Sequence, residues 1–521
     1  MDEPLEIFAL SNEGLIVPRK DDLSGKLKEI QKKYARRKWI IITSALVLLV
    51  AAFLIYKNIR GISGFTGDKS IAVLPFENTG TDSSEEYISD GITQDIINNL
   101  SKISSLKKVI GWFSVRSFKK ATKTLKQIAD ELGVAAVLSG AMQKHEGKIH
   151  IVVELIEVST NKRLWGFDFE YASKDIVSIQ TNVAGEIVTA LKANITPEEK
   201  KNLSKHSTEN VEAYNLYNKG QSFWTIGRGD SSEVYYRRAI NLDAGYAKAY
   251  AGLAECFVLK NGNGLTRFDA MLIAKQFAEK ALSLDSTLGE AFCALGFIQQ
   301  NFLYEWAESA RTLKKAIALN PNYSFAHFYY GNLLQFTGDT KAGLTELKKA
   351  LELDPLNVRI NWALARNLYF AGEYDLAIKQ CQKNLSLYPK DRGTMQTLGF
   401  TYLAKKLYSQ ARDVFNQLPP DDKTFLDNNQ IMQSYAYAVM GDKAKAKMLL
   451  EITLKKYPDQ SNYRLAQVYI ALENFNEAMN QLEQGYESRG LQMFWLKVDP
   501  ALNPLRNEPR FKALLKKMNL D

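Results

Sequence analysis

The sequence predicts a multidomain α+β protein with a single membrane-spanning helix, then a small α/β domain, then an all-α solenoid of helix pairs. Three observations predict this order: an uncharged stretch near the N-terminus, a segment that alternates strand-like and helix-like patterns, and three prolines at a fixed interval. The predicted parts are a basic segment at 1–38, the membrane helix at 39–56, the α/β domain at 68–195, the solenoid at 211–488 and a cap at 489–521.

The stretch from Trp39 to Tyr56 has 18 residues and no charge. As a helix it would rise about 27 Å, enough for a bilayer core, and its terminal aromatic residues suit the membrane interface. Seven basic residues lie between Lys26 and Lys38, and few follow the stretch. The positive-inside rule therefore predicts a cytosolic N-terminus and export of everything after Tyr56. A buried core helix is the competing interpretation; a cleaved signal peptide is disfavoured because the apolar run starts late.

The segment after this stretch predicts a mixed sheet covered by helices. Buried or alternating apolar runs indicate five strands, and amphipathic runs indicate three helices. The predicted elements are a strand at 70–76, a helix at 85–103, a strand at 108–112, a helix at 125–132 that ends at Gly133, strands at 135–144, 148–158 and 163–171, and a helix at 175–192. Such an order packs as an α/β sandwich.

About 125 residues of this segment resemble a known family. The runs IAVLPFENTG, YISDGITQDIINNLSKI, ELGVAAVLSGAMQK and LIEVSTNKRLWGFDFEY are similar to the TolB-like N-terminal domain that often precedes tetratricopeptide arrays in bacterial signalling proteins. The resemblance implies recognition or assembly without catalysis. Together with the apolar stretch and the positive-inside rule, the chain is predicted to lie in the bacterial inner membrane with its bulk in the periplasm. Asp90 is interpreted as a helix or turn partner and Arg116 as a solvated residue.

The second half of the chain repeats. Pro321, Pro355 and Pro389 stand 34 residues apart, and glycines such as Gly331 and Gly343 occur where two helices must approach closely. A proline ends the second helix of each unit because it cannot continue the hydrogen-bond ladder. This pattern resembles the tetratricopeptide repeat and predicts about eight units. The recurrence argues against unrelated amphipathic helices.

The residues after the repeats follow a different pattern. Phe494-Trp495, Asp499-Pro500 and Pro509-Arg510-Phe511 resemble the closing segment found after many bacterial repeat arrays. Without such a segment the last repeat would expose an apolar face. We therefore predict a cap over the last repeat.

The N-terminal residues carry a second resemblance. The alternating segment Pro4–Leu10 is similar to the C-terminal edge strand of class III adenylate/guanylate cyclase domains. A cytosolic cyclase, one membrane helix, a TolB-like domain and a repeat array form a recognisable order of parts. The metal-binding and catalytic residues of that family would lie upstream of Met1, so none is assigned to this chain. The cyclase resemblance would also imply a homodimer.

Composition and motifs favour a binding protein over an enzyme. The net charge is +9 and 46% of the residues are hydrophobic, which excludes wholesale disorder. The basic cluster before Trp39 is interpreted as a topology determinant that meets anionic lipid, so no nucleic-acid partner is predicted. Cys256, Cys293 and Cys381 are interpreted as buried apolar residues. Phosphate-loop, zinc-protease and nucleophile-elbow motifs are absent from the sequence, and no catalytic residue, metal or cofactor is predicted.

The predicted binding surface is the concave face of the solenoid, formed by the first helix of each unit. In the clearest units this face would carry six residues, with an arginine among aromatic rings that suits a peptide or protein partner: Phe328, Asn332, Gln335, Trp362, Arg366 and Tyr369. Contacts between neighbouring units are the alternative role for these side chains.

Two functions remain open from the sequence. The first is a membrane-anchored scaffold or sensor whose exported repeats bind a peptide or protein. The second is the sensory or regulatory part of a class III cyclase receptor whose catalytic domain is missing from this chain.

Overall fold

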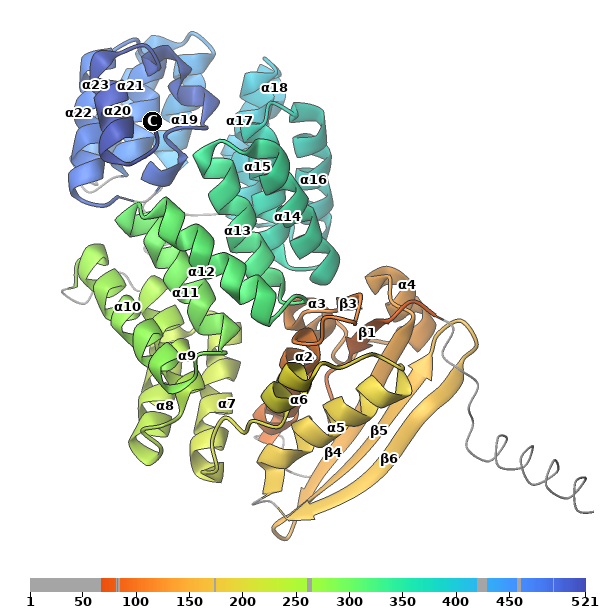
Figure 1. Ribbon diagram of the computed structural model, residues 1–521. Coiled ribbons are helices and arrows are strands. Elements are labelled where there is room, and N and C mark those ends of the chain that lie inside the picture. The colour runs from red at the N-terminus through yellow and green to blue at the C-terminus, as the bar shows by residue number, and fades with distance from the viewer. Residues whose placement is uncertain are drawn as a thin grey trace, which may run out of the picture. The chain divides into compact units, whose positions relative to one another are not determined.

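A mixed six-stranded sheet organises the first folded part of the computed structural model (Figure 1). The structure describes residues 67–521 except 81, 83–84, 173–174, 260–264, 419–428, 457–460 and 491. The elements of this part are β1 (Ser70–Val73), β2 (Glu77–Asn78), α2 (Glu86–Ser101), β3 (Lys108–Val109), α3 (Trp112–Arg116), α4 (Leu125–Leu132), β4 (Ala136–His145), β5 (Lys148–Glu157), β6 (Lys162–Ala172), α5 (Ile176–Ala190) and α6 (Pro197–Leu203).

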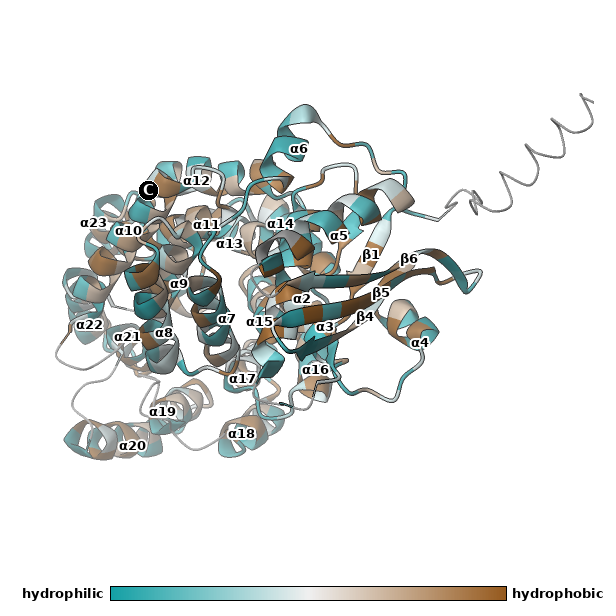
Figure 2. Cartoon of the chain, turned by 90° about the horizontal axis from the view of Figure 1, so that it is seen from below, coloured by the Kyte–Doolittle hydropathy of each residue, from teal (hydrophilic) through white to brown (hydrophobic). Residues whose placement is uncertain are grey.

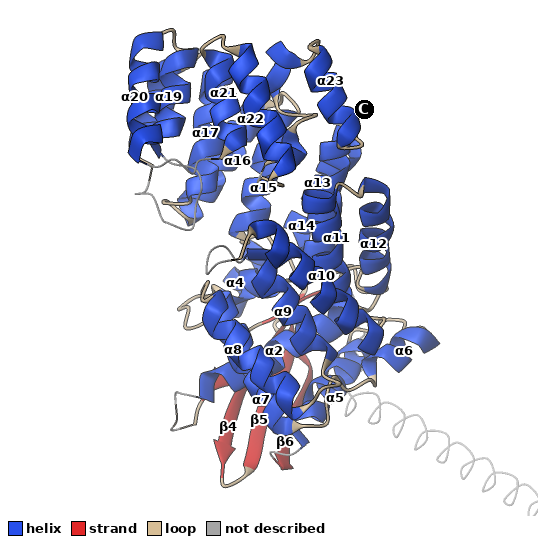
Figure 3. Ribbon diagram, turned by 90° about the vertical axis from the view of Figure 1, so that its left-hand side faces the viewer, coloured by secondary structure: helices blue, strands red, loops and turns tan. Residues whose placement is uncertain are grey.

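The strand order is β3-β1-β4-β5-β6, and β2 pairs with β4. Strands β3, β1 and β4 run parallel, whereas β4, β5 and β6 run antiparallel. Helices α2 and α5 contribute Ile92, Ile96, Val183 and Ile187 to the same buried cluster as the sheet residues. Burial of these apolar side chains is the main term that holds the layers together. Figure 3 shows that the strands are confined to this part of the fold.

One predicted strand is shorter than expected. The prediction places a strand at 108–112, but β3 ends at Val109 and Trp112 begins α3. The Ile110 amide still donates to Ile71 O at 3.0 Å, and the next amide, Gly111 N–H, donates instead to Leu353 O at 2.8 Å. The chain leaves the sheet here because its next hydrogen-bond partners lie in the repeats.

The second part of the fold is a series of antiparallel helix pairs. The pairs are α7 (Val211–Thr225) with α8 (Gly229–Leu242), α9 (Ala247–Leu259) with α10 (Arg267–Leu284), α11 (Gly289–Ile298) with α12 (Trp306–Leu319), α13 (Ser324–Thr337) with α14 (Thr340–Leu353), α15 (Val358–Phe370) with α16 (Tyr374–Leu387), α17 (Arg392–Ala404) with α18 (Tyr408–Asn416), α19 (Asn429–Val439) with α20 (Lys443–Lys456), and α21 (Asn462–Ala471) with α22 (Phe475–Glu487). A π-helix, η3 (Gln299–Leu303), extends α11.

Small residues lie where the paired helices meet, as the sequence predicts. A Cβ added to Gly331 would lie 2.9 Å from Gly343 O, and one added to Gly343 would lie 2.8 Å from Gly331 O. Both distances are shorter than any normal contact, so α13 and α14 can approach this closely only with glycine at both positions. Figure 2 shows hydrophilic and hydrophobic residues on the same repeat helices, as expected for amphipathic helices.

The C-terminal segment covers more than the last repeat. It comprises η4 (Met493–Trp495), η5 (Pro500–Leu505) and α23 (Pro509–Lys517). Asp499 accepts a hydrogen bond from the Tyr463 hydroxyl of α21 at 2.6 Å, as a cap over the last repeat would. The Met518 carbonyl also accepts a hydrogen bond from Trp306 Nε1 of α12 at 2.6 Å. The cap therefore connects the end of the array to its middle.

The predicted membrane helix requires a correction. Residues 1–38 and 39–56 lie outside the described residues, as does the cyclase-like segment Pro4–Leu10. No described helix is both long enough and apolar enough to cross a membrane. The single transmembrane helix of the predicted fold class and the predicted single-pass inner-membrane location, with its periplasmic bulk, are therefore not supported. The fold that the structure supports is a mostly helical solenoid joined to an α/β domain.

Candidate binding cleft between the sheet and the repeats

Buried polar contacts attach the α/β domain to the repeats. Asp354, which follows α14, is 1% exposed and accepts hydrogen bonds from the Ser114 amide at 2.8 Å and from the Ser114 hydroxyl. Asn357 Nδ2 donates to the same carboxylate at 2.9 Å. Together with the bond from Gly111 N–H to Leu353 O, these contacts hold the start of α3 against the turn between α14 and α15.

Helix α2 forms a second group of contacts. Asp95 is 4% exposed and accepts hydrogen bonds from Lys248 Nζ of α9 at 2.7 Å and from the Tyr214 hydroxyl of α7 at 2.9 Å. Asn322 Nδ2, which precedes α13, donates to Leu106 O at 3.1 Å. Buried polar groups need hydrogen-bond partners, so bonds between the α/β domain and the repeats fix how these two parts pack. The α/β domain and the repeats accordingly belong to one compact unit, Phe65–Asp521.

Two polar residues singled out in the sequence have structural roles. Asp90 forms an ion pair with Lys119 at 2.6 Å within the α/β domain. Arg116, which was predicted to be solvated, donates from Nη1 to Thr225 O of α7 at 3.0 Å. The prediction for Arg116 was wrong because it followed from a strand ending at Trp112, whereas α3 carries Arg116 toward the repeats.

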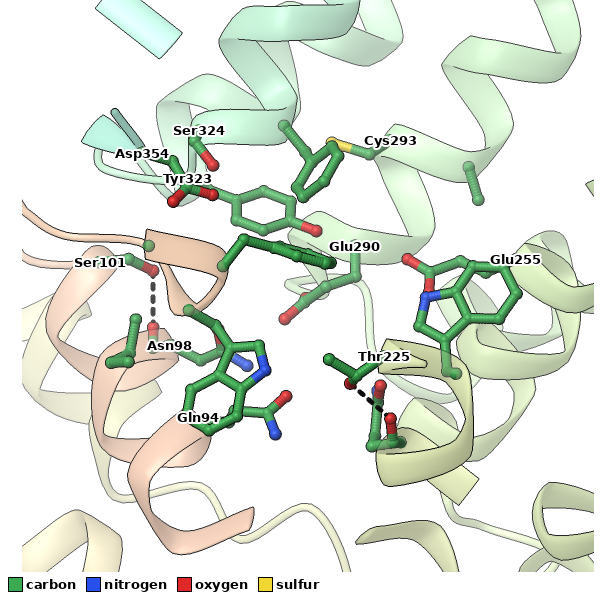
Figure 4. Close-up of a pocket in the computed structure, with 18 of the residues that line it drawn as sticks. Gln94, Asn98, Ser101, Thr225, Glu255, Glu290, Cys293, Tyr323, Ser324 and Asp354 are labelled. Atoms are coloured by element: carbon green, nitrogen blue, oxygen red, sulfur yellow. Dashed lines mark hydrogen bonds between the residues drawn. The ribbon is translucent and has the colours of Figure 1, made fainter. Parts of the chain in front are cut away.

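A cavity of about 140 Å³ remains between the two parts, and we name it the interdomain cleft. Helices α2 and α3 line one side, and α7, α9, α11, α13 and the start of α15 line the other (Figure 4). The lining side chains include Gln94, Asn98, Trp112, Phe113, Tyr217, Trp224, Glu255, Glu290, Phe297, Tyr323, Phe325, Tyr329, Asp354 and Arg359. Because one water position needs about 10–15 Å³, the cleft has room for one or two long side chains but not for a folded domain.

Four charged residues line the cleft: the carboxylates Glu255, Glu290 and Asp354 and the guanidinium of Arg359. Glu255 of α9 and Glu290 of α11 have no hydrogen bond or ion pair to any described residue. Burial and the nearby charge of Glu290 raise the pKa of Glu255 to about 7, while the positive charge of Arg359 opposes this shift. Figure 4 shows the Glu290 carboxylate directed toward Asn98 and Gln94 of α2. No hydrogen bond or ion pair neutralises Glu255 or Glu290, although Arg359 acts on Glu255, and Lys248 and Lys102 interact with the charge of Glu290, without direct contact.

Aromatic side chains form much of the remaining wall. Phe113 of α3 and Phe325 of α13 meet edge to face across the boundary, with ring centroids 5.8 Å apart. Trp112 Nε1 is buried and has no hydrogen-bond partner among the described residues. Trp224 of α7 lines the same space. Aromatic faces beside carboxylates attract cations, because the ring quadrupole and the negative charge act in the same direction.

The six residues predicted for the concave surface lie elsewhere. Phe328, Asn332, Gln335, Arg366 and Tyr369 are each at most 8% exposed, and Trp362 is half-buried. Asn332 Oδ1 accepts hydrogen bonds from Arg366 Nη2 at 2.8 Å and from Asn367 Nδ2 at 3.0 Å, which join neighbouring units. None of the six lines the interdomain cleft, but Trp362, Arg366 and Tyr369 line a smaller cavity farther along the array. An open peptide-binding surface at these six positions stays a prediction, and their burial favours the alternative role between units.

The sequence contains one signal for the cleft that periodicity alone does not reveal. Glu255 stands alone in the run YAGLAECFVL, where every neighbour within four residues is apolar or small. A lone carboxylate in such a helix is costly unless it is paired or lines a cavity. Its partners could not be identified, because α2 and α3 approach α9 only through tertiary contacts. Among the described residues, no group of three or more His, Cys, Asp or Glu side chains could hold a metal ion.

Comparison with protein families confirms the repeats and corrects the α/β resemblance. Tetratricopeptide-repeat models match residues 213–246, 331–392, 430–459 and 459–489. Residues 67–186 match the second domain of HilA/YgeH-like transcriptional regulators. These family models support neither the predicted TolB-like domain nor a cyclase domain within this chain.

Individual relatives match only parts of the chain. A Rhizobium meliloti (strain 1021) protein with the provisional name adenylate cyclase 3 is 32% identical over 224 residues, which cover 42% of this chain and 38% of that protein. Superkiller complex protein 3 of Mus musculus is 27% identical over 278 residues, which cover 50% of this chain and 17% of that protein. The chain thus spans well under half the length of these curated relatives.

Solved structures of repeat proteins are also similar. A thermophilic tetratricopeptide protein of Thermus thermophilus is 21% identical and covers 37% of this chain and 99% of its own, with a TM-score of 0.32. The pilF protein of Pseudomonas aeruginosa is 18% identical and covers 42% and 93%, with a TM-score of 0.33. Both TM-scores are below 0.5, so the repeat assignment rests on the family models. These comparisons give no support to a membrane partner or to a homodimer.

Proposed function

We propose that this chain is a protein-interaction module whose interdomain cleft binds a basic side chain of a partner polypeptide. Tetratricopeptide repeats are suited to protein–protein interaction and are typically non-catalytic. Binding of a basic side chain is supported mainly by Glu255 and Glu290. These two carboxylates lie in a partly desolvated cavity and have no hydrogen-bonded or ion-paired partner among the described residues.

The size and walls of the cleft support a lysine or arginine side chain. The volume of about 140 Å³ admits a long side chain, and a positive head group would reach the two carboxylates. The aromatic residues Trp112 and Trp224 would contact its aliphatic stem. An acidic or phosphorylated side chain would meet like charge, which costs several kcal/mol in a desolvated site.

The attachment of the α/β domain supports a preformed site. Asp354 and Asp95 fix α3 and α2 relative to the inner repeat helices, so both sides of the cleft are held before a partner arrives. Preorganisation of this kind lowers the entropy cost of binding. We infer that the α/β domain contributes one wall of the site.

A random-peptide phage library tests the proposal without knowledge of the partner. The full chain should enrich peptides that contain Lys or Arg, and the double variant Glu255→Gln with Glu290→Gln should not enrich them. The matched control is Glu279→Gln with Glu308→Gln, which removes two exposed carboxylates from α10 and α12. Equal enrichment of basic peptides by the cleft variant and the wild type would contradict the assignment of the site.

A second candidate function is regulation of an adenylate cyclase catalytic domain. It is supported by the similarity over 224 residues to the Rhizobium meliloti protein with a cyclase name, 38% of whose length this chain covers. The test is to titrate this chain into the purified remainder of that protein and to measure cyclic AMP formation. A saturable change in rate would support regulation, and an unchanged rate would argue against it.

A further inference from the structure

Strand β6 forms one edge of the sheet in the α/β domain (Figure 1). It pairs with β5 on one side, and no other described strand pairs with it. Because successive backbone groups of a strand point in alternate directions, about half of the N–H and C=O groups of β6 point away from β5. Such a row of backbone groups is a template for one more strand.

The two edges of the sheet differ. At the other edge, β3 has only two residues, and the chain after it donates from Gly111 N–H to Leu353 O of the repeats at 2.8 Å. Strand β6 has 11 residues, contains no proline, and pairs with β5 without irregularity from Trp165 to Ala172. Natural proteins usually shorten, bend or cover an edge of this length. A long and regular edge that no described strand covers therefore suits the addition of an extended segment.

One face of β6 carries a row of aromatic rings, namely Trp165, Phe167, Phe169 and Tyr171. The ring centroids of Phe167 and Phe169 are 3.9 Å apart, and those of Phe169 and Tyr171 are 5.5 Å apart. Three of the four rings pack partly against the core of the domain, whereas Phe167 is 48% exposed. An apolar side chain on an added strand would pack beside Phe167 and cover it.

The opposite face of β6 is acidic along its regular part. The side chains of Asp168 and Glu170 are 69% and 58% exposed. Each carboxylate has a partner on β5: His150 contacts Asp168, and Lys148 Nζ lies 2.6 Å from Glu170. A strand on the other side of β6 would place its own side chains about 5 Å from these two residues, where opposite charge stabilises the pair and like charge destabilises it.

We propose that the Trp165–Ala172 edge binds an extended segment of a partner polypeptide in which apolar and basic residues alternate. The backbone of the segment continues the sheet, its apolar side chains pack beside Phe167, and its basic side chains face the two carboxylates. Arg163 does not oppose them, because it lies beyond the regular part of the strand and forms an ion pair with Glu154 of β5 at 3.1 Å. The edge is separate from the interdomain cleft, whose lining includes no residue of β6.

Fluorescence anisotropy with a labelled peptide, Lys-Val-Lys-Val-Lys-Val-Lys-amide, tests this proposal. The full chain carries Glu255→Gln and Glu290→Gln, so that binding at the cleft does not contribute. We expect saturable binding of this peptide but not of its N-methylated counterpart, which keeps every side chain and cannot donate to a strand. A peptide with Glu in place of Lys should bind about tenfold more weakly or worse.

Three results of this titration would overturn the proposal. The absence of saturable binding, or equal binding of the N-methylated peptide, would contradict addition to the sheet. Equal binding of the Glu peptide would contradict the preference for a basic segment. If the cleft variant does not fold, the difference between the peptide and its N-methylated counterpart is measured on the wild type instead.

Variants locate the binding edge. Asp168→Asn with Glu170→Gln should weaken binding about fivefold. The matched control is Asp130→Asn with Glu131→Gln, which removes two exposed, ion-paired carboxylates from α4 and should leave the affinity unchanged. If the β6 double variant does not fold, Phe167→Thr keeps a strand-forming residue, removes the exposed ring and should also weaken binding. Unchanged affinity in the folded β6 variant would overturn the assignment.

Sedimentation equilibrium distinguishes a second copy of this chain as the occupant of the edge. We expect the mass of the unliganded chain not to change when the peptide is added, apart from the mass of the peptide itself. A dimer that the peptide dissociates would assign the edge to a second copy and would overturn the proposal of a basic partner segment.

Discussion

Ser114 and Asp354 lie 240 residues apart in the sequence and are hydrogen-bonded in the interior of the protein. The Ser114 amide donates to Asp354 at 2.8 Å, and the Ser114 hydroxyl accepts a hydrogen bond from the Leu356 amide at 2.9 Å. This contact joins α3 of the α/β domain to the turn that separates two repeats. It explains how α3, which begins where the predicted strand was expected to end, holds one wall of the interdomain cleft in place.

Asp354 should make stability depend on pH. Burial raises its pKa to about 6 from an ordinary value near 3.8, so the folded state holds the proton more tightly than the unfolded state. Its contribution to stability is therefore present below about pH 4 and is lost as the pH rises through 6, on the order of 3 kcal/mol in total. We expect Asp354→Asn to flatten this part of the pH dependence in urea unfolding.

The control for this experiment is Glu352→Gln, an exposed carboxylate two residues away on α14. It should leave the pH dependence of the unfolding midpoint between pH 4 and 7 as in the wild type. If Asp354→Asn shows the same slope as the wild type and the control, the buried carboxylate does not titrate in this range.

Gly111→Ala should weaken the attachment of α3. The added Cβ would lie 2.8 Å from Asp354 Cγ and 2.9 Å from Asp354 Oδ2, so the carboxylate or the helix must move. Overpacking of this kind typically costs about 1–3 kcal/mol. Hydrogen exchange should become faster in residues 112–116 of the variant. Protection equal to that of the wild type would mean that the contact is looser than the structure indicates.

Gly331→Ala should destabilise the repeats directly. The new methyl group would lie 2.9 Å from Gly343 O and force α13 away from α14, with a cost of about 1–3 kcal/mol and a lower melting temperature. Gly185→Ala is the matched control, because Gly185 also lies within a helix and an added Cβ meets nothing within 4 Å. That control should be neutral or slightly stabilising, by up to about 1 kcal/mol. Equal melting temperatures for the two variants would contradict the close helix contact.

Local patterns predicted the repeats and most of the sheet. The glycines at 331 and 343 and the periodic prolines reflect contacts within one helix pair, and the αL conformation of Gly133 after α4 (φ 62°) follows from the residue itself. The alternation of apolar and polar residues along β5 likewise predicts which of its side chains are buried and which are more exposed. Such features are visible because the residues that decide them are close in sequence.

Features that depend on distant partners were missed. Trp112 begins a helix because the preceding Gly111 N–H donates to Leu353 O in the repeats instead of to the sheet. The cap contacts the middle of the array through the hydrogen bond from Trp306 Nε1 to Met518 O. The six residues predicted for the concave surface were assigned by helix position alone. That assignment did not include the cap residue Trp495, whose ring contacts the Arg366 guanidinium. The interdomain cleft as a whole could not be predicted, because its walls come from segments far apart in the chain, although Glu255 gives one signal for it in the sequence.

Binding to the cleft should also depend on pH. Because Glu255 has a pKa of about 7, it is largely neutral at pH 6 and largely charged at pH 8. A cationic side chain binds the charged form better, so affinity for a basic peptide should rise as the pH rises through 7. Glu255→Gln should remove most of this rise. A flat profile in the wild type, measured by fluorescence anisotropy with a labelled peptide, would argue against contact with Glu255.

The most direct test of the central claim is a calorimetric titration at pH 8 of one basic peptide selected on the wild type. We predict that the affinity falls at least tenfold, about 1.4 kcal/mol, in the variant with both Glu255→Gln and Glu290→Gln. The control with Glu279→Gln and Glu308→Gln should bind as the wild type does. An unchanged dissociation constant in the folded cleft variant would contradict the claim that the interdomain cleft is the binding site.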